Sequence, residues 1–432
     1  MAIAILTRWS MTYWPYHEWL ADSTDELHLF TAAAKLDLPE PERERALARY
    51  ASVHTYDNLE RNARALLDIA DLARQKPLKA LVAQAEWDIG WAGGLRDRLR
   101  IPGQDQASAL AYKNKLIMKE HLRAAGLPTA SYRRVETILD VYDHANQYGY
   151  PLVVKPTSAG GAIGVVFIDN REQLDAFAEP GLAPRIETPP DLMVEGFIEG
   201  RQYIVDGLVL DGKLVFCWPS AYIGAPSDYH EGGRHLAAVM IEADHPLRAR
   251  LQEITRAVLG ALPSPRTFPF HAEFYHTPDD RLVVGEIGSR TGGARIDDMY
   301  NPIFGVQSLN RAWVRYDAGL DPGVESFDDV ECARSRGVAG WITFSPQPGL
   351  VRRLPSPPTD PRVNFRLTAR PGMRLVQPVH SGDFFASAVV TGTSFSEVEA
   401  RINRLADWFW NNTEIAGDGP APLTKEKAGA FS

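Results

Sequence analysis

The chain has 432 residues, of which 45% are hydrophobic and 23% are charged, a balance typical of globular proteins with two or three domains. Its 46 basic and 55 acidic side chains give a formal net charge of −9, which argues against a protein that coats nucleic acid. Two cysteines are too few for a disulfide framework or a zinc cluster. The apolar run from Ala2 to Leu6 is too short for a signal peptide, and no stretch reaches the length of a transmembrane helix. We therefore expect a cytoplasmic enzyme or binding protein with no nucleic-acid or membrane partner.

The first hundred residues predict a parallel α/β unit. "AIAILT" and "KALVAQAE" are typical of buried strands, and the second strand ends at Glu86. Apolar periodicity predicts a helix over residues 57–75, and "GWAGGLRDRLRIPG" predicts a shorter helix. Sites in such units lie beyond the carboxyl ends of strands, so Glu86 is a candidate site residue. Isolated acids are usually hydrated, however, and we expect Glu86 to be a solvated strand-end residue.

A glycine-rich loop follows in the next segment. "KNKLIMKEHLRAAGLP" predicts a helix, and "YPLVVKPTSAGGAIGVVFI" predicts two strands around a loop, with Lys155 at the end of the first strand. Glycines allow backbone N–H groups to approach phosphate oxygens, and a lysine adds positive charge. The loop fits neither a Walker A motif nor a dinucleotide-binding turn. Taken alone, three nearby glycines are more commonly explained by a flexible turn between strands.

Two hairpins follow, and the second one brings two acids together. "QYIVDGLVLDGKLVFCW" predicts a hairpin turning at Asp211–Gly212, and "HAEFYHTPDDRLVVGEIG" predicts one turning at Pro278–Asp280. If the second turn is centred on its Asp-Asp step, Glu273 lies opposite Glu286 on one face. Carboxylates about 5 Å apart repel by about 3 kcal/mol at an effective dielectric constant near 20. A divalent cation turns this repulsion into attraction, and oxygen ligands suit magnesium. The alternative is a shifted register with both acids solvated.

The last part of the chain predicts a capped helix and a tail. "SFSEVEARINRLADWFW" has an apolar helical stripe, with a capping box formed by Ser394 and Glu397. The residues from Gly417 onward predict a disordered tail.

In combination these motifs resemble the ATP-grasp superfamily over Gly103 to Leu320. The order is Lys115, then Lys155 with its glycine loop, the "VEGFI" strand, Glu273 and finally "EIGSR". The segments "VAGWITFSPQPGLVRRL" and "HSGDFFASAVVTGTSFSEVEARI" resemble the C-terminal lobe of carboxylate–amine ligases of the L-amino acid ligase type. The resemblance implies an α/β (α+β) ATP-grasp fold. Its expected parts are a Rossmann-like domain at residues 1–107, a nucleotide-binding domain at 108–320 and a C-terminal lobe at 321–432.

The resemblance also implies roles for individual residues. ATP phosphates would be held by Lys115, Lys155 and the loop residues Ser158, Gly160, Gly161 and Gly164. The adenine edge would be held by the backbone of Glu195, Gly196, Phe197 and Ile198, and the ribose by Gln202. Glu273 and Glu286 would bind Mg²⁺, with Mn²⁺ as an alternative. Arg290 would hold the reacting carboxyl and phosphoryl oxygens, because a guanidinium binds planar oxyanions in a bidentate way.

Arg295 follows the paired glycines Gly292 and Gly293, where it would meet the carboxylate of an amino-acid substrate; the alternative is a surface arginine. The chain departs from the family at Gly288, where Asn is usual, so that Ser289 or water would complete the metal shell. Gln202 also replaces a glutamate, and Ala162 a frequent serine.

The implied function is ATP-dependent amide formation through an acyl phosphate, with a small-molecule carboxylate and amine as substrates and a homodimer as a candidate assembly. The alternatives are an ATP-grasp carboxylase or purine-pathway-type ligase, or an ATP-binding regulatory protein without catalysis. For a general base, His271 and His276 are the candidates.

Overall fold

The computed structural model describes residues 1–59, 62–161, 163–179, 191–224, 233–324, 337–378 and 382–417. Ala162 and the predicted tail from residue 418 lie outside these ranges. Contacts divide the chain into two compact units. The first comprises Met1–Pro219, Asp244–Gly292 and Phe304–Arg334, and the second comprises Ser220–Ala243, Gly293–Ile303 and Ser335–Ser432. The division into three domains at residues 107 and 320 stays a prediction.

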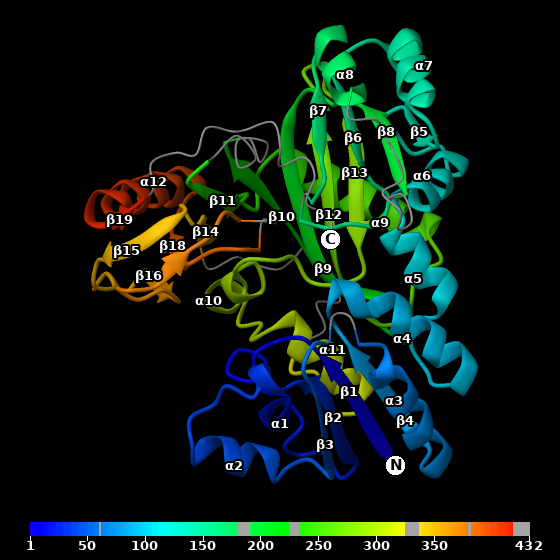
Figure 1. The fold of residues 1–432 in the computed structure, drawn as a ribbon, viewed down its shortest axis with the longest axis vertical. Helices are drawn as coiled ribbons and strands as arrows, with labels where there is room; N and C mark the ends of the chain where they lie inside the picture. The colour runs from blue at the N-terminus through cyan, green and yellow to red at the C-terminus, as the bar shows by residue number, and fades with distance from the viewer. Residues whose placement is uncertain are drawn as a thin grey trace. The chain divides into compact units, whose positions relative to one another are not determined.

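The first unit begins with a parallel sheet in the order β3-β2-β1-β4, coloured blue in Figure 1. Its strands are β1 (Ala2–Thr7), β2 (Glu26–Ala32), β3 (Ser52–Tyr56) and β4 (Leu78–Ala83). Its helices are α1 (Tyr16–Trp19), the 3-10 turn Ala33–Lys35, α2 (Glu42–Leu47), α3 (Arg64–Gln75) and α4 (Glu86–Leu99). Every residue of β1 is buried, and alternate side chains enter two separate hydrophobic clusters, one on each face. Burial on both faces is typical of parallel sheets and confirms the predicted α/β unit.

Two boundaries differ from the predictions in this region. The helix predicted over residues 57–75 begins only at Arg64. The strand predicted to reach Glu86 ends at Ala83, and Glu86 is instead the first residue of α4. Glu86 therefore lies at the start of a helix, where an acidic side chain complements the helix dipole.

A second sheet in the first unit is antiparallel, in the order β5-β8-β6-β7. It contains β5 (Tyr132–Val135), β6 (Leu152–Pro156), β7 (Val166–Ile168) and β8 (Leu192–Gly196). Helices α7 (Ile138–Tyr148) and α8 (Arg171–Ala178) bury Val141, Ala145 and Leu174 against it. Helices α5 (Gln106–Lys113) and α6 (Lys115–Ala124) precede this sheet, and the single helix predicted from Lys113 is thus the second of two.

The third sheet of the first unit has the order β13-β12-β9-β10. Its strands are β9 (Arg201–Leu210), β10 (Lys213–Ile223), β12 (Phe268–His276) and β13 (Leu282–Gly288). Helices α9 (Leu247–Ala261) and α11 (Leu309–Asp317) pack against β9. The first predicted hairpin is confirmed, because Asp211 and Gly212 join β9 to β10 with φ values of 49° and 77°. Positive φ at both positions is the requirement of a type I′ turn.

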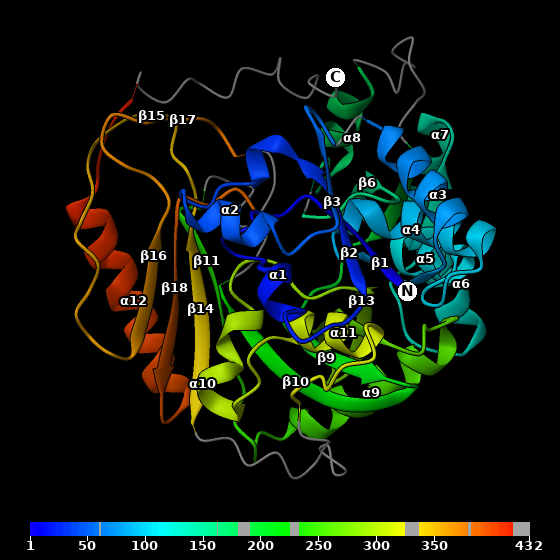
Figure 2. The ribbon, with the colours of Figure 1, turned by 90° about the horizontal axis from the view of Figure 1, so that it is seen from below.

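The second unit contains the end of β10 followed by β11, β14, β18 and β16 in that spatial order. The elements of this unit are β11 (His235–Met240), the 3-10 turn Asp297–Met299, β14 (Val338–Phe344), β15 (Gly349–Arg353), β16 (Val363–Leu367), β17 (Arg374–Leu375), β18 (Ala386–Gly392), α12 (Phe395–Asn412) and β19 (Glu414–Ala416); α10 (Asn301–Phe304) runs from this unit into the first. Figure 2 shows α12 lying along β11, β14 and β18. Strands β15, β17 and β19 form a separate small sheet in the order β17-β15-β19.

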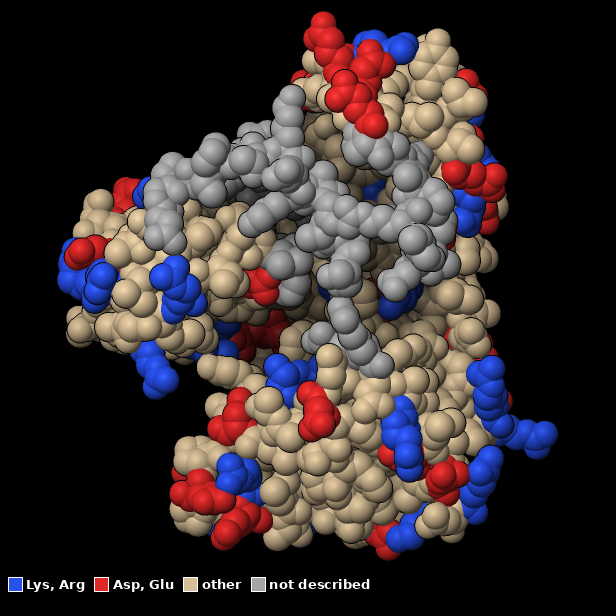
Figure 3. All heavy atoms as spheres, in the orientation of Figure 1, with Lys and Arg blue, Asp and Glu red and all other residues tan. Residues whose placement is uncertain are grey.

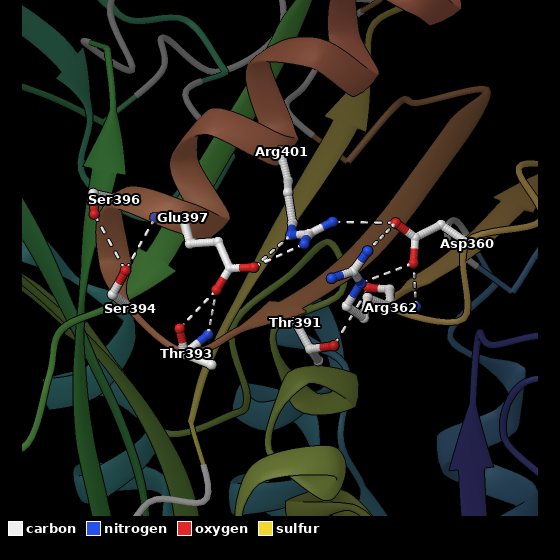
Figure 4. Close-up of polar contacts among 8 residues, drawn as sticks. All are labelled: Asp360, Arg362, Thr391, Thr393, Ser394, Ser396, Glu397 and Arg401. Carbon is white, nitrogen blue, oxygen red and sulfur yellow. Dashed lines mark hydrogen bonds and ion pairs between the residues drawn. The ribbon is translucent and has the colours of Figure 1, made fainter.

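The start of α12 shows the predicted cap in altered form (Figure 4). The Ser394 hydroxyl accepts a hydrogen bond from the N–H of Glu397 at 3.2 Å, as a capping residue does. The Glu397 carboxylate, however, accepts from the N–H and hydroxyl of Thr393, both at 2.8 Å, so the reciprocal bond reaches one residue further back than in a capping box. On its other side Glu397 accepts from Arg401 at 2.7 Å, and Arg401 also pairs with Asp360.

The distribution of surface charge and the hydropathy of the helices relate to the prediction of no nucleic-acid or membrane partner. On the face drawn in Figure 3, acidic and basic side chains are intermixed over the N-terminal elements. Among the residues that the structure describes, no helix combines the length and the apolar character needed to cross a membrane. The cytoplasmic location and the absence of a nucleic-acid partner stay predictions.

Candidate active site

The hairpin of β12 and β13 places Glu273 directly opposite Glu286. This pairing was predicted, but the register that leads to it is interrupted. From the turn to Phe274, each β12 residue pairs with a β13 residue one position earlier than the Glu273–Glu286 register requires. Phe274, for example, pairs with Val284 and not with Gly285. One extra residue, Gly285, restores the register. A Cβ at Gly285 would lie 3.0 Å from the Tyr275 ring and 3.1 Å from the Glu273 carbonyl oxygen, so a glycine fits this bulge best.

Glu286 faces a lysine from a distant helix. Lys115 is the first residue of α6, and its Nζ lies 3.2 Å from Glu286 Oε2 and 2.6 Å from the Ala159 carbonyl oxygen. Burial alone would raise the pKa of Glu286, but Lys115, Lys155 and Arg290 outweigh it and lower that pKa to about 2. Glu286 is therefore an anion at neutral pH, and three cations converge on it from three separate parts of the chain.

Glu273 is held by different partners. Gln202 donates from Nε2 to Glu273 Oε2 at 2.8 Å, so the amide expected to bind ribose lies beside the expected metal ligand. His271 Nε2 lies 3.6 Å from Glu273 Oε1, and its Nδ1 lies 2.8 Å from Asp206. Burial alone would lower the pKa of His271, but Asp206 and Glu273 raise it to about 9. His271 is thus protonated at neutral pH and is a poor general base.

His276, the other candidate base, lies at the far end of β12. Its Nε2 is 2.7 Å from Asp280 in the hairpin turn, five residues along the strand from His271. A strand rises by about 3.4 Å per residue, so His276 lies on the order of 17 Å from His271. Neither histidine is therefore placed as a proton acceptor.

Lys155 is the penultimate residue of β6 and pairs with the buried carboxylate of Glu195 on β8. A second lysine, Lys119 on α6, lies 3.2 Å from the other oxygen of Glu195, and only 1% of its side chain is exposed. Burial raises the pKa of Glu195, but the two lysines lower it to about 2. The sequence motifs did not single out Lys119. The available signal was its spacing, since it lies four residues, or one helical turn, after Lys115.

The loop after Lys155 adopts the conformation that its glycines permit. Gly161 and Gly164 have φ values of 64° and 70°, which L side chains rarely adopt. Gly160 lies close to α4, because a Cβ added at Gly160 would lie 3.7 Å from Cγ of Glu86, the first residue of that helix. The Ser158 hydroxyl lies 3.4 Å from that of Thr157.

The expected adenine-binding segment is partly occupied by internal hydrogen bonds. The N–H of Gly196 donates to the Ser131 carbonyl oxygen at 3.0 Å, and that of Phe197 to the Pro151 carbonyl oxygen at 3.1 Å. An adenine held here would use other backbone groups of the segment, such as those of Ile198. The Phe197 side chain is 45% exposed and meets Phe167 edge to face.

Arg290 is held by an acid that was expected to be solvated. Its Nε donates to Glu86 Oε2 at 2.8 Å, and its Nη1 donates to the Thr291 carbonyl oxygen at 3.1 Å. Burial lowers the pKa of Arg290, but Glu86 and Glu286 raise it further, so the guanidinium is always charged. The expectation of a solvated Glu86 was wrong, because Glu86 pairs with Arg290. It lies just past the carboxyl end of β4, where sites in parallel α/β units form.

Two further predictions concern neighbours of Arg290. Ser289 is 1% exposed and exchanges hydrogen bonds with Gln104 at 3.0 and 3.1 Å, so it is not free to replace the missing metal ligand at Gly288. Arg295, in the second unit, is 4% exposed, pairs with Asp298 and donates to Asn364 at 3.0 Å. The alternative of a surface arginine was therefore wrong, and its catalytic role stays a prediction.

A pocket in the first unit gathers many of these residues. Its lining comprises Glu86, Tyr112, Lys113, Lys115, Met118, Ala159, Gly160, His271, Glu286, Ile287, Gly288 and Arg290. In the described parts of the chain no group of three or more His, Cys, Asp or Glu side chains is arranged to hold a metal. A closed protein cage is thus not what this site offers. Two facing carboxylates do fit Mg²⁺, which is typically held by one or two carboxylates together with water and substrate phosphates.

Comparison with known proteins decides the family. A family model described as an ATP-grasp domain matches residues 148–298, which include the glycine loop, Glu195, Glu273, Glu286 and Arg290. The chain contains an ATP-grasp domain over these residues. The resemblance inferred from the motifs is thereby confirmed.

Two sequence relatives and one solved structure are also similar to this chain. It is 28% identical over 287 residues, covering 66% of this chain and 67% of the relative, to an L-arginine-specific L-amino acid ligase of Bacillus subtilis. It is 40% identical over 129 residues to a D-alanine–D-alanine ligase of Geobacter sulfurreducens, covering 29% of this chain and 39% of that relative. The solved L-amino acid ligase of Bacillus licheniformis superposes with a TM-score of 0.72 at 17% identity, covering 96% and 98% of the two chains. The last comparison confirms the predicted fold class.

Proposed function

We propose that this ATP-grasp protein is an ATP-dependent, ADP-forming ligase that joins a carboxylate to an amine, with amino acids or small carboxylic acids as substrates. The observation that carries the proposal is the pairing of Glu273 with Glu286 across one hairpin, with Arg290 in the same pocket as Glu286. The amino-acid ligases among the sequence relatives support the same reaction class.

The cofactors of this reaction are ATP and Mg²⁺, as in other ATP-grasp enzymes. Glu273 and Glu286 would hold the metal, with Mn²⁺ as a candidate substitute. When bound, Mg²⁺ supplies positive charge that offsets the charge on the phosphate oxygens. Lys115, which contacts Glu286 in this structure, would hold a phosphate oxygen when Glu286 serves as a metal ligand. Lys155 would contact a second phosphate group.

The first chemical step is attack on the terminal phosphate of ATP. A carboxylate oxygen of the substrate forms a bond to the γ-phosphorus, the bond to the β–γ bridging oxygen breaks, and ADP leaves. Arg290 would hold the carboxylate and the transferring phosphoryl group together, so that its contact strengthens as charge moves. Glu86 engages Nε of this guanidinium and the Thr291 carbonyl oxygen engages Nη1, so that Nη2 would be the terminal nitrogen that faces substrate.

The second step forms the amide. The uncharged amine attacks the acyl carbon, the carbon–oxygen bond to phosphate breaks, and phosphate leaves while the new amide loses a proton. The raised pKa of His271 and the remote position of His276 leave the proton acceptor unassigned among the described side chains. Departing phosphate is itself basic enough to accept that proton, since the second pKa of a phosphate ester is about 6.

A screen of carboxylates crossed with amines, with phosphate release as the signal, tests this function. Release that requires both a carboxylate and an amine supports the ligase. Release with bicarbonate and no other carboxylate would identify a carboxylase, and ATP binding without release under any pair would favour the regulatory alternative. A homodimer, for which sedimentation would be the measurement, stays a prediction.

A further inference from the structure

Helix α6 presents two lysines to two different glutamates of the nucleotide site. Lys115 and Lys119 are one turn apart on the same face of the helix. Lys115 reaches Glu286 on β13, and Lys119 reaches Glu195 on β8, each with a nitrogen–oxygen distance of 3.2 Å. The face of α6 that packs onto the site is therefore a line of positive charge.

Glu195 is shared between two lysines. Its Oε1 contacts Lys155, and its Oε2 faces Lys119. The exposed fractions of the three side chains are 11% for Glu195, 15% for Lys155 and 1% for Lys119. Charges this well buried interact strongly, because little water separates them. Two cations thus face one anion at Glu195, and Lys155, on which Glu286 and Glu273 also act, is the more exposed of the two lysines.

An anion that approaches Lys155 meets a lysine already paired with Glu195. A carboxylate paired with a single lysine neutralises it, and an incoming phosphate must then compete with that carboxylate for the same ammonium group. With Lys119 on its other oxygen, Glu195 is already balanced, and the charge of Lys155 stays available. The ring of Tyr132, 5.9 Å from Lys119 Nζ, adds a further favourable contact for the buried ammonium group.

We propose that Lys119 is a positioning residue that balances Glu195 and so frees Lys155 to bind a phosphate group of the nucleotide. Lys119 acts through Glu195 and has no contact with the nucleotide itself. The inference rests on the proposed function, in that it assigns ATP phosphate as the anion that Lys155 receives.

The test is the affinity for ATP with Mg²⁺, measured by titration calorimetry on the full chain without other substrates. Lys119→Met keeps the length of the side chain but removes its charge, and it should raise the dissociation constant at least about tenfold, the effect of losing one modest charge contact. Lys119→Arg should stay within about threefold of the wild-type chain, since it keeps the charge.

The decisive variant is the double change Lys119→Met with Glu195→Gln. Removing the competing carboxylate should recover most of the lost affinity, and the amide oxygen of the glutamine can still accept a hydrogen bond from Lys155. A merely structural role for Lys119 predicts the opposite, because a second change in a packed cluster adds damage. Lys79→Met is the matched control, since it breaks the 3.0 Å ion pair with Asp25 in the N-terminal sheet and should leave ATP affinity unchanged.

The outcomes separate this inference from the proposed function. If the wild-type chain fails to bind ATP, the proposed function fails. If it binds ATP and Lys119→Met binds equally well, or if the double variant binds more weakly than Lys119→Met, the role assigned to Lys119 is wrong.

Discussion

Arg290 donates a hydrogen bond from Nε to Glu86 Oε2 at 2.8 Å, across 204 positions of sequence. Glu86 opens the last helix of the parallel α/β region, and Arg290 follows the strand that carries Glu286. The pair fixes the guanidinium by one edge, which directs its remaining N–H groups. The N-terminal region thus contributes to the candidate site as well as to the core.

Arg290→Lys should leave ATP affinity within about twofold of the wild-type value and slow turnover at least about tenfold. A lysine supplies the charge but lacks the planar fork that can bind carboxylate and phosphoryl oxygens together. ATP affinity by calorimetry and steady-state ADP release are the measurements, and Arg281→Lys, which pairs with the exposed Asp279, is the control. Normal turnover in Arg290→Lys would make this arginine a structural residue.

Glu86→Gln should slow turnover by about three- to tenfold, because the amide oxygen still accepts from Arg290 without the charge that holds it. In combination with Arg290→Lys the two effects should be non-additive, since both act through one contact. Steady-state rates of the four chains form a double-mutant cycle. Full additivity would show that Glu86 acts independently of Arg290.

Gly285→Ala should disrupt the bulge that brings Glu286 opposite Glu273. The added Cβ meets the Tyr275 ring and the Glu273 carbonyl oxygen, and such overpacking costs about 1–3 kcal/mol of unfolding free energy. ADP formation should fall together with stability. Gly260→Ala, in α9 with open space around its Cα, should be stabilising by up to about 1 kcal/mol in the same denaturant titration. A Gly285→Ala chain with wild-type stability and activity would refute the role given to the bulge.

The hairpin also shows what sequence reasoning reaches. Alternation along two strands was enough to pair Glu273 with Glu286, because strand side chains alternate between two faces. It missed the one-residue shift near the turn, although Gly285 inside a strand is the usual sign of a bulge. The two errors cancelled, since the predicted turn centre, between Asp279 and Asp280, lies about half a residue beyond the observed centre at Asp279.

Long-range ion pairs could not be predicted in the same way. Glu86 with Arg290, and Lys119 with Glu195, join segments whose closeness depends on how sheets and helices pack, which no local pattern encodes. The engagement of Ser289 with Gln104 is of the same kind. Motif spacing therefore gave the fold and the ligands expected for nucleotide and metal, while the residues that hold those ligands in place required the structure.

Ser394→Ala should lower the unfolding free energy by about 1 kcal/mol, the usual effect of losing a helix N-cap. The Ser394 hydroxyl accepts from the N–H of Glu397 at the start of α12, and alanine cannot replace it. Ser356→Ala, at an exposed serine between β15 and β16, is the control. Denaturant unfolding monitored by tryptophan fluorescence measures the difference, and equal stabilities of the two variants would contradict the capping role.

The central claim is that the reacting carboxylate becomes an acyl phosphate before the amine attacks. Its most direct test uses the carboxylate identified by the substrate screen, labelled with ¹⁸O at both oxygens, and mass spectrometry of the released phosphate. We predict one ¹⁸O atom in each phosphate, because the attacking carboxylate oxygen leaves with the phosphoryl group, and one ¹⁸O in the amide product. Phosphate without ¹⁸O, formed together with the amide, would show that ATP is consumed without activating the carboxylate and would contradict the account.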